Sequence, residues 1–123
     1  MTVTELVKRL NLEILVEGDG SREVTGGYAG DLLSWVMGRA REGDAWITVM
    51  GNLNAIAVAV LSDTACIILS EDAALDKDAR ERAVTEGIPI LRSSETSFQL
   101  AVKIDRLLHN YKYNVDGFST HRY

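Results

Sequence analysis

The sequence has one cysteine, one proline and no cluster of basic residues, and each scarcity excludes a class of protein. Cys66 can form no internal disulfide and lacks the neighbouring ligands of a zinc site, so we expect it to be a small buried apolar side chain. The 13 Lys and Arg residues are scattered and are outnumbered by 18 Asp and Glu residues. Because phosphate backbones need clustered cations, we expect no nucleic-acid partner.

Long apolar runs are missing as well. No run approaches the ~18 residues that a membrane span needs, and no basic region precedes an apolar segment at the N-terminus, so we expect no membrane association and a cytoplasmic location. The 123 residues are 46% hydrophobic and 25% charged, which is the composition of an ordinary globular protein. A chain of this length can bury one hydrophobic core.

The chain alternates between helical and strand patterns. Thr2 and Glu5 have the spacing of a capping box ahead of a short helix, and Asp31 stands near the start of a second helix. Asn52 or Asn54 is expected to cap a third helix over the apolar run 55–61, and Gly87 to end a fourth. A last helix is expected after a cap at 93–95, and strands are expected over 12–16, 22–25, 45–50, 66–69 and 88–91.

Strands that alternate with helices pair in parallel through right-handed crossovers. The predicted fold class is therefore α/β, with a central, mostly parallel sheet of about five strands flanked by helices. Residues 1–109 are expected to form this domain, and the polar and aromatic residues 110–123 a flexible or partner-docked tail. Ligands of such sheets bind at the carboxyl ends of the strands, where we expect the loops 26–31, 50–54, 70–76 and 92–95.

Catalytic motifs are missing from these loops. Gly26, Gly27 and Gly30 do not have the spacing of a dinucleotide fingerprint, and no glycine is followed by lysine as in a phosphate-binding loop. His109 and His121 lie at or beyond the end of the last helix, too far along to activate a nucleophile in the central loops. We therefore expect no catalytic residue, no metal and no cofactor.

Four residues have both a structural and a functional interpretation. Asp31 and Ser34 can be an acid beside a hydroxyl, but their spacing is also that of an ordinary helix start. Trp35 and Trp46 can stack on a planar ligand, but burial in the core or at a subunit contact is the favoured interpretation.

Four stretches carry a resemblance to a known family: 22–34 (REVTGGYAGDLLS), 45–49 (AWITV), 54–61 (NAIAVAVL) and 86–91 (EGIPIL). In this order they resemble the DRTGG domain family, although only Thr25-Gly26-Gly27 matches the end of the string that names it. The resemblance implies a fold similar to the N-terminal domain of HPr kinase/phosphorylase. It also implies a dimer, and a module that elsewhere accompanies CBS domains in regulated pyrophosphatases and accompanies phosphotransacetylases.

The resulting functional hypothesis is a non-enzymatic regulatory or sensing domain that forms a homodimer and binds a small anionic or nucleotide-like ligand. A homodimer is also favoured because a five-stranded sheet with one helix layer would hide too little of the apolar surface. The alternative is an interaction subunit that binds a protein partner and no small molecule, and a small enzyme is a distant third. The candidate ligand-binding residues offer backbone N–H groups, amides, hydroxyls and a carboxylate: Gly26, Gly27, Tyr28, Asp31, Ser34, Gly51, Asn52 and Asn54.

Overall fold

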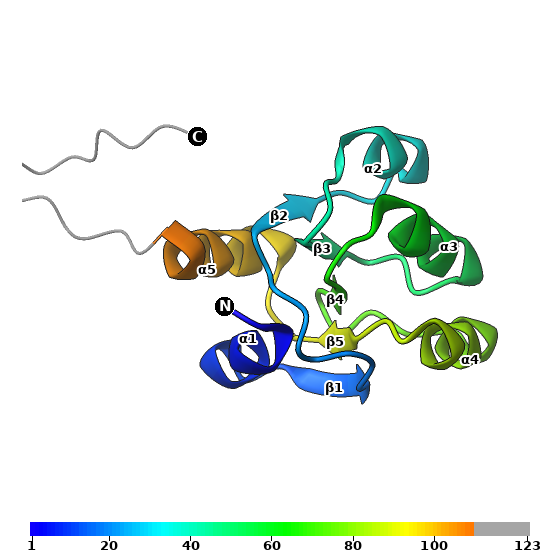
Figure 1. The fold of residues 1–123 in the computed structure, drawn as a ribbon, viewed down its shortest axis with the longest axis horizontal. Helices are drawn as coiled ribbons and strands as arrows, with labels where there is room; N and C mark the ends of the chain where they lie inside the picture. Colours follow the sequence, from blue (N-terminus) through cyan, green and yellow to red (C-terminus); the bar gives the residue numbers. More distant parts are fainter. Residues whose placement is uncertain (110–123) are drawn as a thin grey trace, which may run out of the picture.

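The computed structural model describes residues 1–109, which form a five-stranded sheet with helices on both faces (Figure 1). The helices are α1 (Val3–Leu10), α2 (Leu33–Arg39), α3 (Leu53–Ser62), α4 (Lys77–Glu86) and α5 (Ser97–His109). The strands are β1 (Glu13–Val16), β2 (Gly26–Ala29), β3 (Asp44–Thr48), β4 (Cys66–Leu69) and β5 (Ile90–Arg92). The tail expected over 110–123 lies outside the described residues.

The strands are ordered β1-β5-β4-β3-β2. Strands β2 to β5 are parallel to one another, and β1 alone runs antiparallel, beside β5. Each parallel strand is followed by a helix, which is the connection that parallel pairing requires. The predicted α/β class with a mostly parallel, helix-flanked sheet is confirmed.

The sheet separates two apolar clusters. On one face α2, α3 and α4 cover Trp46 and Ile67, and on the other α1 and α5 cover Ile47 and Ile68 (Figure 1). The expectation of a single helix layer was therefore wrong. Fully burying an aliphatic side chain of this size stabilises the fold by ~1.5–3 kcal/mol, so both clusters contribute to stability. Cys66 is fully buried in the α1/α5 cluster, as its sequence context predicted.

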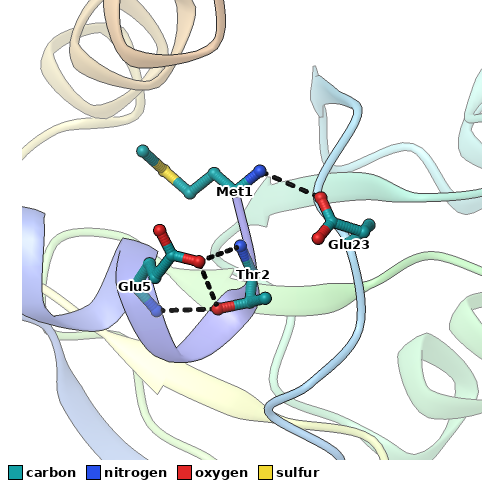
Figure 2. Close-up of polar contacts among 4 residues, drawn as sticks. All are labelled: Met1, Thr2, Glu5 and Glu23. Atoms are coloured by element: carbon teal, nitrogen blue, oxygen red, sulfur yellow. Dashed lines mark hydrogen bonds and ion pairs between the residues drawn. The ribbon is translucent and has the colours of Figure 1, made fainter.

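The first residues of the chain are held by a capping box (Figure 2). The Glu5 N–H donates to Thr2 Oγ1 at 3.1 Å, and the Thr2 N–H donates to Glu5 Oε1 at 3.3 Å. In the same view the Met1 ammonium donates to Glu23 Oε2 at 2.9 Å. Glu23 thereby fastens the segment that leads into β2 to the start of α1.

The strand expected over 22–25 was wrong. These residues run beside the chain start, where the Val24 N–H donates to the Met1 carbonyl at 2.8 Å, and make one isolated bridge between Thr2 and Glu23. The strand that enters the sheet is the next segment, Gly26–Ala29. Glycine has a low intrinsic strand preference, so pairing with β3 overrides the local signal here.

Helix ends follow the predicted chemistry at two positions and differ at a third. Asn52 Oδ1 accepts from the Ala55 N–H at 2.9 Å, so Asn52 rather than Asn54 caps α3, and Gly87 ends α4 at φ 71°. The cap of α5 is Thr96, whose Oγ1 accepts from the Gln99 N–H at 3.2 Å. The cap had been expected at 93–95, which is one to three residues earlier. Among the described helices, none is long and apolar enough to cross a membrane.

Candidate functional site

The four loops that follow β2 to β5 lie along one edge of the sheet, because parallel strands end on the same side. They are residues 30–32, 49–52, 70–76 and 93–96. Backbone hydrogen bonds join neighbouring loops: the Asp76 N–H donates to the Gly51 carbonyl at 2.8 Å, and the Asp72 N–H donates to the Ser93 carbonyl at 2.9 Å. The loops therefore form one connected rim above the sheet.

Asp31 links the first two loops. Its Oδ1 accepts from the Thr48 hydroxyl at 2.7 Å and from the Val49 N–H at 2.9 Å. The Thr48 hydroxyl oxygen also accepts from the Met50 N–H at 3.2 Å, and Thr48 itself is fully buried at the end of β3. The carboxylate of Asp31 thus has a fixed position beside the connection from β3 to α3.

The expected role of Asp31 in starting α2 was wrong. The N-cap position of α2 is Leu32, and no side-chain hydrogen bond caps that helix. The Asp31 carboxylate instead accepts hydrogen bonds from Thr48, at the end of β3, and from Val49. The spacing of residues in the sequence could not show this contact. Ser34 lies exposed in the first turn of α2.

Gly26, Gly27 and Tyr28 do not lie in the loop in which they were expected, because they form β2. A Cβ on Gly26 would come 2.6 Å from Asp44 Oδ1, and one on Gly27 would lie 3.8 Å from Ile104 Cγ2 of α5. Tyr28 is half-buried and packs against the cluster under α2, α3 and α4. These three residues are therefore removed from the rim, and the connection from β2 to α2 is only 30–32.

Gly51, Asn52 and Asn54 do lie together at the rim. Gly51 is packed directly against the backbone of Ala74 in the β4–α4 loop. The side chain of Asn52 is used by the helix cap, whereas Asn54 is exposed in the first turn of α3. Asp31 is bonded to the start of the loop that carries Gly51 and Asn52, and Asn54 follows this loop in α3. Asp31 and Asn54 present exposed polar side chains.

The two tryptophans have different surroundings. Trp46 is fully buried, and its Nε1–H donates to the Gly30 carbonyl at 2.9 Å, so it supports the first rim loop from below. Trp35 on α2 is 53% exposed, and the Arg39 guanidinium carbon lies 3.6 Å from the centre of its ring. The expected burial in the core is therefore confirmed for Trp46, whereas Trp35 lies at the surface of the single chain, where a subunit contact stays a prediction.

Sequence reasoning missed a hollow of about 360 Å³ between β2 and α5. Its lining includes Gly27, Ala29, Phe98 and Ala101, and Phe98 is 77% exposed. A second apolar stripe on α5, at Phe98, Ala101 and Leu108, was the signal in the sequence that pointed to it. Across residues 1–109, no group of three or more His, Cys, Asp or Glu side chains is placed to hold a metal ion.

Comparison with known proteins identifies the family. The model of the DRTGG domain matches residues 5–107, and the chain belongs to this family. No curated protein matches the chain.

Among solved structures, the chain is similar to the CBS and DRTGG domains of the regulatory region of Clostridium perfringens pyrophosphatase, complexed with the activator diadenosine tetraphosphate. The TM-score is 0.61 at 14% sequence identity, over 82% of this chain and 44% of that one. The present chain thus spans less than half of that regulatory region, and the likeness supports the fold.

Proposed function

We propose that this chain is a non-enzymatic regulatory or sensing domain of the cytoplasm that forms a homodimer and binds a small anionic or nucleotide-like ligand. Two findings support it: the chain belongs to the DRTGG family, and the similar pyrophosphatase carries its DRTGG domain in a regulatory region that was solved with a nucleotide activator. The structural observation that carries the proposal is the fixed Asp31 carboxylate beside the loop that leads from β3 into α3.

The polar groups around Asp31 and the start of α3 suit a nucleotide-like molecule. The first N–H groups of α3, at Leu53 and Asn54, have no intrahelical partner and lie at the positive end of the helix dipole, which favours a phosphate. The exposed Asn54 amide adds a donor. Asp31 repels a bare anion but accepts from a ribose hydroxyl or an amino group. A ligand that offers both phosphate and hydroxyl groups therefore fits better than inorganic phosphate.

The proposed site contains only some of the candidate ligand-binding residues that the sequence suggested. Asp31, Gly51, Asn52 and Asn54 form it, with Ser34 at its margin on α2. Gly26, Gly27 and Tyr28 belong to β2 and are left out.

Exposed apolar side chains support the dimer. Helix α3 carries no charged residue, and its outer surface includes Leu61, which is 71% exposed. The neighbouring exposed side chains on and before α2 and α3 are Leu32, Trp35, Met37, Leu53 and Val60. Because α3 is uncharged, it can pack on its own copy without like-charge repulsion, and a stable interface buries at least ~1,000 Å². Light scattering should give about twice the 13.5 kDa chain mass, and a 13.5 kDa particle at micromolar concentration would contradict the dimer.

The ligand is tested by thermal unfolding in the presence of adenine nucleotides, sugar phosphates and dicarboxylates. A ligand at about a hundred times its Kd stabilises the fold by ~2.7 kcal/mol, which raises Tm by several degrees in a domain of this size. Asn54→Glu should abolish the shift, because it places a negative charge where the phosphate binds. The same charge at a helix N-terminus does not destabilise the unliganded fold.

Gln99→Glu is the matched control. It adds one negative charge to the first turn of α5 and keeps the capping arrangement with Thr96. The ligand-induced shift should survive in this variant. If no compound raises Tm, or if the shift survives Asn54→Glu, the rim is structural only.

In that case the interaction-subunit alternative replaces the proposal. It is favoured by the same exposed apolar surface of α2 and α3, which a different protein can cover instead of a second copy. A stable complex with another protein, formed by a chain that stays monomeric alone, would distinguish it.

A further inference from the structure

The groove between α5 and β2 is not used by the proposed function. It has a volume of about 360 Å³, with Gly27 and Ala29 of β2 on one wall and Phe98, Ala101 and Leu108 of α5 on the other. Phe98 is 77% exposed although its side chain is fully apolar. Apolar surface that is gathered in a hollow, rather than scattered over the protein, is typical of a binding site.

The β2 wall of this groove is an open edge of the sheet (Figure 1). Within residues 1–109, β2 pairs only with β3. The Gly30 N–H donates to the Ile47 carbonyl of β3, and alternate residues of a parallel strand direct their polar groups to opposite sides. Gly27 and Ala29 therefore direct their backbone N–H and C=O groups away from β3, beside the groove.

The two edges of the sheet differ in how they oppose a further strand. The β1 edge carries the charged Glu13, and its register with β5 is irregular between Ile14 and Val16. Charges and bulges of this kind hinder the pairing of another strand. The β2 edge has the sequence Gly-Gly-Tyr-Ala, without charge or proline, and its register with β3 is continuous. The β2 edge is therefore the one that accepts a further strand.

The groove has the length of a short strand. Phe98 near the start of α5 and His109 at its end both line it, so it runs along the helix for about 17 Å at 1.5 Å per residue. A strand covers that length with about five residues at ~3.3 Å each, and alternate residues place three side chains on one face. Gly27 and Ala29 have the smallest side chains possible on the β2 wall, which leaves room for large ones opposite them.

The position of α5 favours a single strand over a second copy of this chain. Helix α5 packs on β2 more than on β3. If two copies paired through their β2 edges, their α5 helices would therefore be closer than about two strand spacings, or ~9.5 Å. Packed helices lie ~8–10 Å apart, at the upper end where large side chains such as Phe98 and Leu108 meet. A strand that brings no helix with it avoids this crowding.

The charge of the groove indicates a basic residue in the added strand. Asp105 lines the groove, whereas none of its described lining residues is lysine or arginine. The Asp105 carboxylate lies 3.0 Å from His109 Nδ1. Asp105 is seven residues beyond Phe98, which is about 10 Å along α5. A lysine or arginine at the third groove-facing position of a strand reaches it, and complementary charges of this kind fix the register of a complex.

We propose that the β2 edge binds an extended segment of a partner protein, which adds to the sheet as a strand antiparallel to β2. Large apolar side chains at two alternate positions of the segment fill the groove beside Phe98 and Ala101, and a lysine or arginine two positions further on faces Asp105. The backbone of the segment pairs with the outward N–H and C=O groups of Gly27 and Ala29. Backbone pairing supplies affinity in this mode of recognition, and the alternate side chains supply specificity.

A fluorescent, capped peptide of sequence Thr-Phe-Thr-Val-Thr-Lys-Thr tests the proposal by fluorescence anisotropy with the full chain. Its Phe, Val and Lys side chains share one face. In a hydrogen-bonded antiparallel pair, opposite residues also share a face, so the Phe and Val amides are the ones that bond to β2. N-methylation of these two amides should weaken binding by about tenfold or more, because it removes both donors. N-methylation of the second and third Thr is the matched control and should change Kd by less than about twofold.

Two variants test the protein side. Ala29→Pro removes an outward N–H of β2 and none of its hydrogen bonds to β3, and proline is tolerated on edge strands. Binding of the unmethylated peptide should weaken by about tenfold. Replacing the peptide's Lys by Glu should weaken binding to the unmodified protein more than to the Asp105→Asn variant, because the charge that Lys faces is then missing.

Three outcomes would overturn the proposal. The first is no binding at about 1 mM peptide. The second is equal weakening by the two methylation patterns, which shows that the peptide does not pair with β2. The third is a parent dimer that Ala29→Pro converts to a monomer, which assigns the edge to a second copy. If Ala29→Pro fails to fold, the methylated peptides decide with the unmodified protein, and none of these results depends on a ligand at the rim.

Discussion

The backbone of Gly51 in the β3–α3 loop lies directly against the carbonyl oxygen of Ala74 in the β4–α4 loop, closer than any side chain would allow. A Cβ at position 51 would overlap that oxygen, and the contact is with backbone that cannot rotate away. The two loops are held at this spacing by the hydrogen bond from the Asp76 N–H to the Gly51 carbonyl. Gly51 therefore sets how closely the loops of the candidate site approach each other.

Gly51→Ala should destabilise the fold by ~1–3 kcal/mol, the usual effect of overpacking. Gly38→Ala is the matched control, because a Cβ there meets no atom within 4 Å. Gly38 lies inside α2, where alanine is favoured over glycine by about 0.5–1 kcal/mol, so this variant should be more stable. Urea unfolding measures both. A Gly51→Ala protein within about 0.5 kcal/mol of the parent would refute the contact.

Asn52→Ala should cost ~1 kcal/mol of unfolding free energy, because it removes the acceptor of the Ala55 N–H at the start of α3. Asn54→Ala, two residues further on, should change stability by less than about 0.5 kcal/mol, since Asn54 is exposed. The comparison by urea unfolding uses the same substitution at two positions at the start of one helix. Equal losses at both positions would mean that the cap is not formed by Asn52 alone.

Cys66 should be unreactive in the folded protein. Burial raises the pKa of the Cys66 thiol to about 12, and the thiolate is the reactive form. At pH 8 a chromogenic disulfide reagent should label the native protein at least tenfold more slowly than the urea-unfolded chain. Rapid labelling without denaturant would show that β4 is not covered by α1 and α5.

Asp44 gives a pH dependence of stability with a defined sign. Burial raises the pKa of its carboxyl, although the hydrogen bond that it accepts from the Arg41 N–H at 2.8 Å opposes this shift. A folded-state pKa above the unfolded value contributes stability at pH below the unfolded value of about 4, and this contribution is lost as the pH rises through the folded value.

Asp44→Asn removes the loss of stability that accompanies ionisation of Asp44, because asparagine does not ionise. The variant keeps an oxygen that accepts from the Arg41 N–H. The difference in unfolding free energy, variant minus parent, should therefore be more positive at pH 7 than at pH 4, which means that the variant gains stability relative to the parent as the pH rises. Urea unfolding of both proteins at the two pH values measures the difference. An equal difference at both values, or a larger one at pH 4, would contradict the burial of a charged Asp44.

Local signals predicted those parts of the fold that local chemistry determines. The strand at 66–69, the capping box of Thr2 and Glu5, and the end of α4 at Gly87 were all placed correctly. Each depends on a short run of apolar residues, a cap within three residues or a glycine at positive φ. The alternation of these elements was then enough to predict a mostly parallel sheet.

The errors occur where tertiary contacts override local preference. Gly26 and Gly27 were assigned to a loop because the strand was expected over 22–25, but they pair with β3 as an edge strand. Asp31 was assigned to the start of α2 because of its position, but it binds Thr48 on a strand 17 residues away. Neither the pairing of β2 with β3 nor the Asp31–Thr48 hydrogen bond can be inferred from residue spacing in the sequence. The residues that form the candidate site could therefore be predicted only in part.

Amide chemical shifts during a titration with adenosine diphosphate test the proposed site most directly. The account predicts that the largest shifts fall on the backbone N–H groups of Val49, Leu53 and Asn54, beside the Asp31 carboxylate, and that Asn54→Glu abolishes them. Largest shifts at Gly27 and Ala101 in the α5 groove, or no shifts at millimolar nucleotide, would contradict a ligand site at the rim.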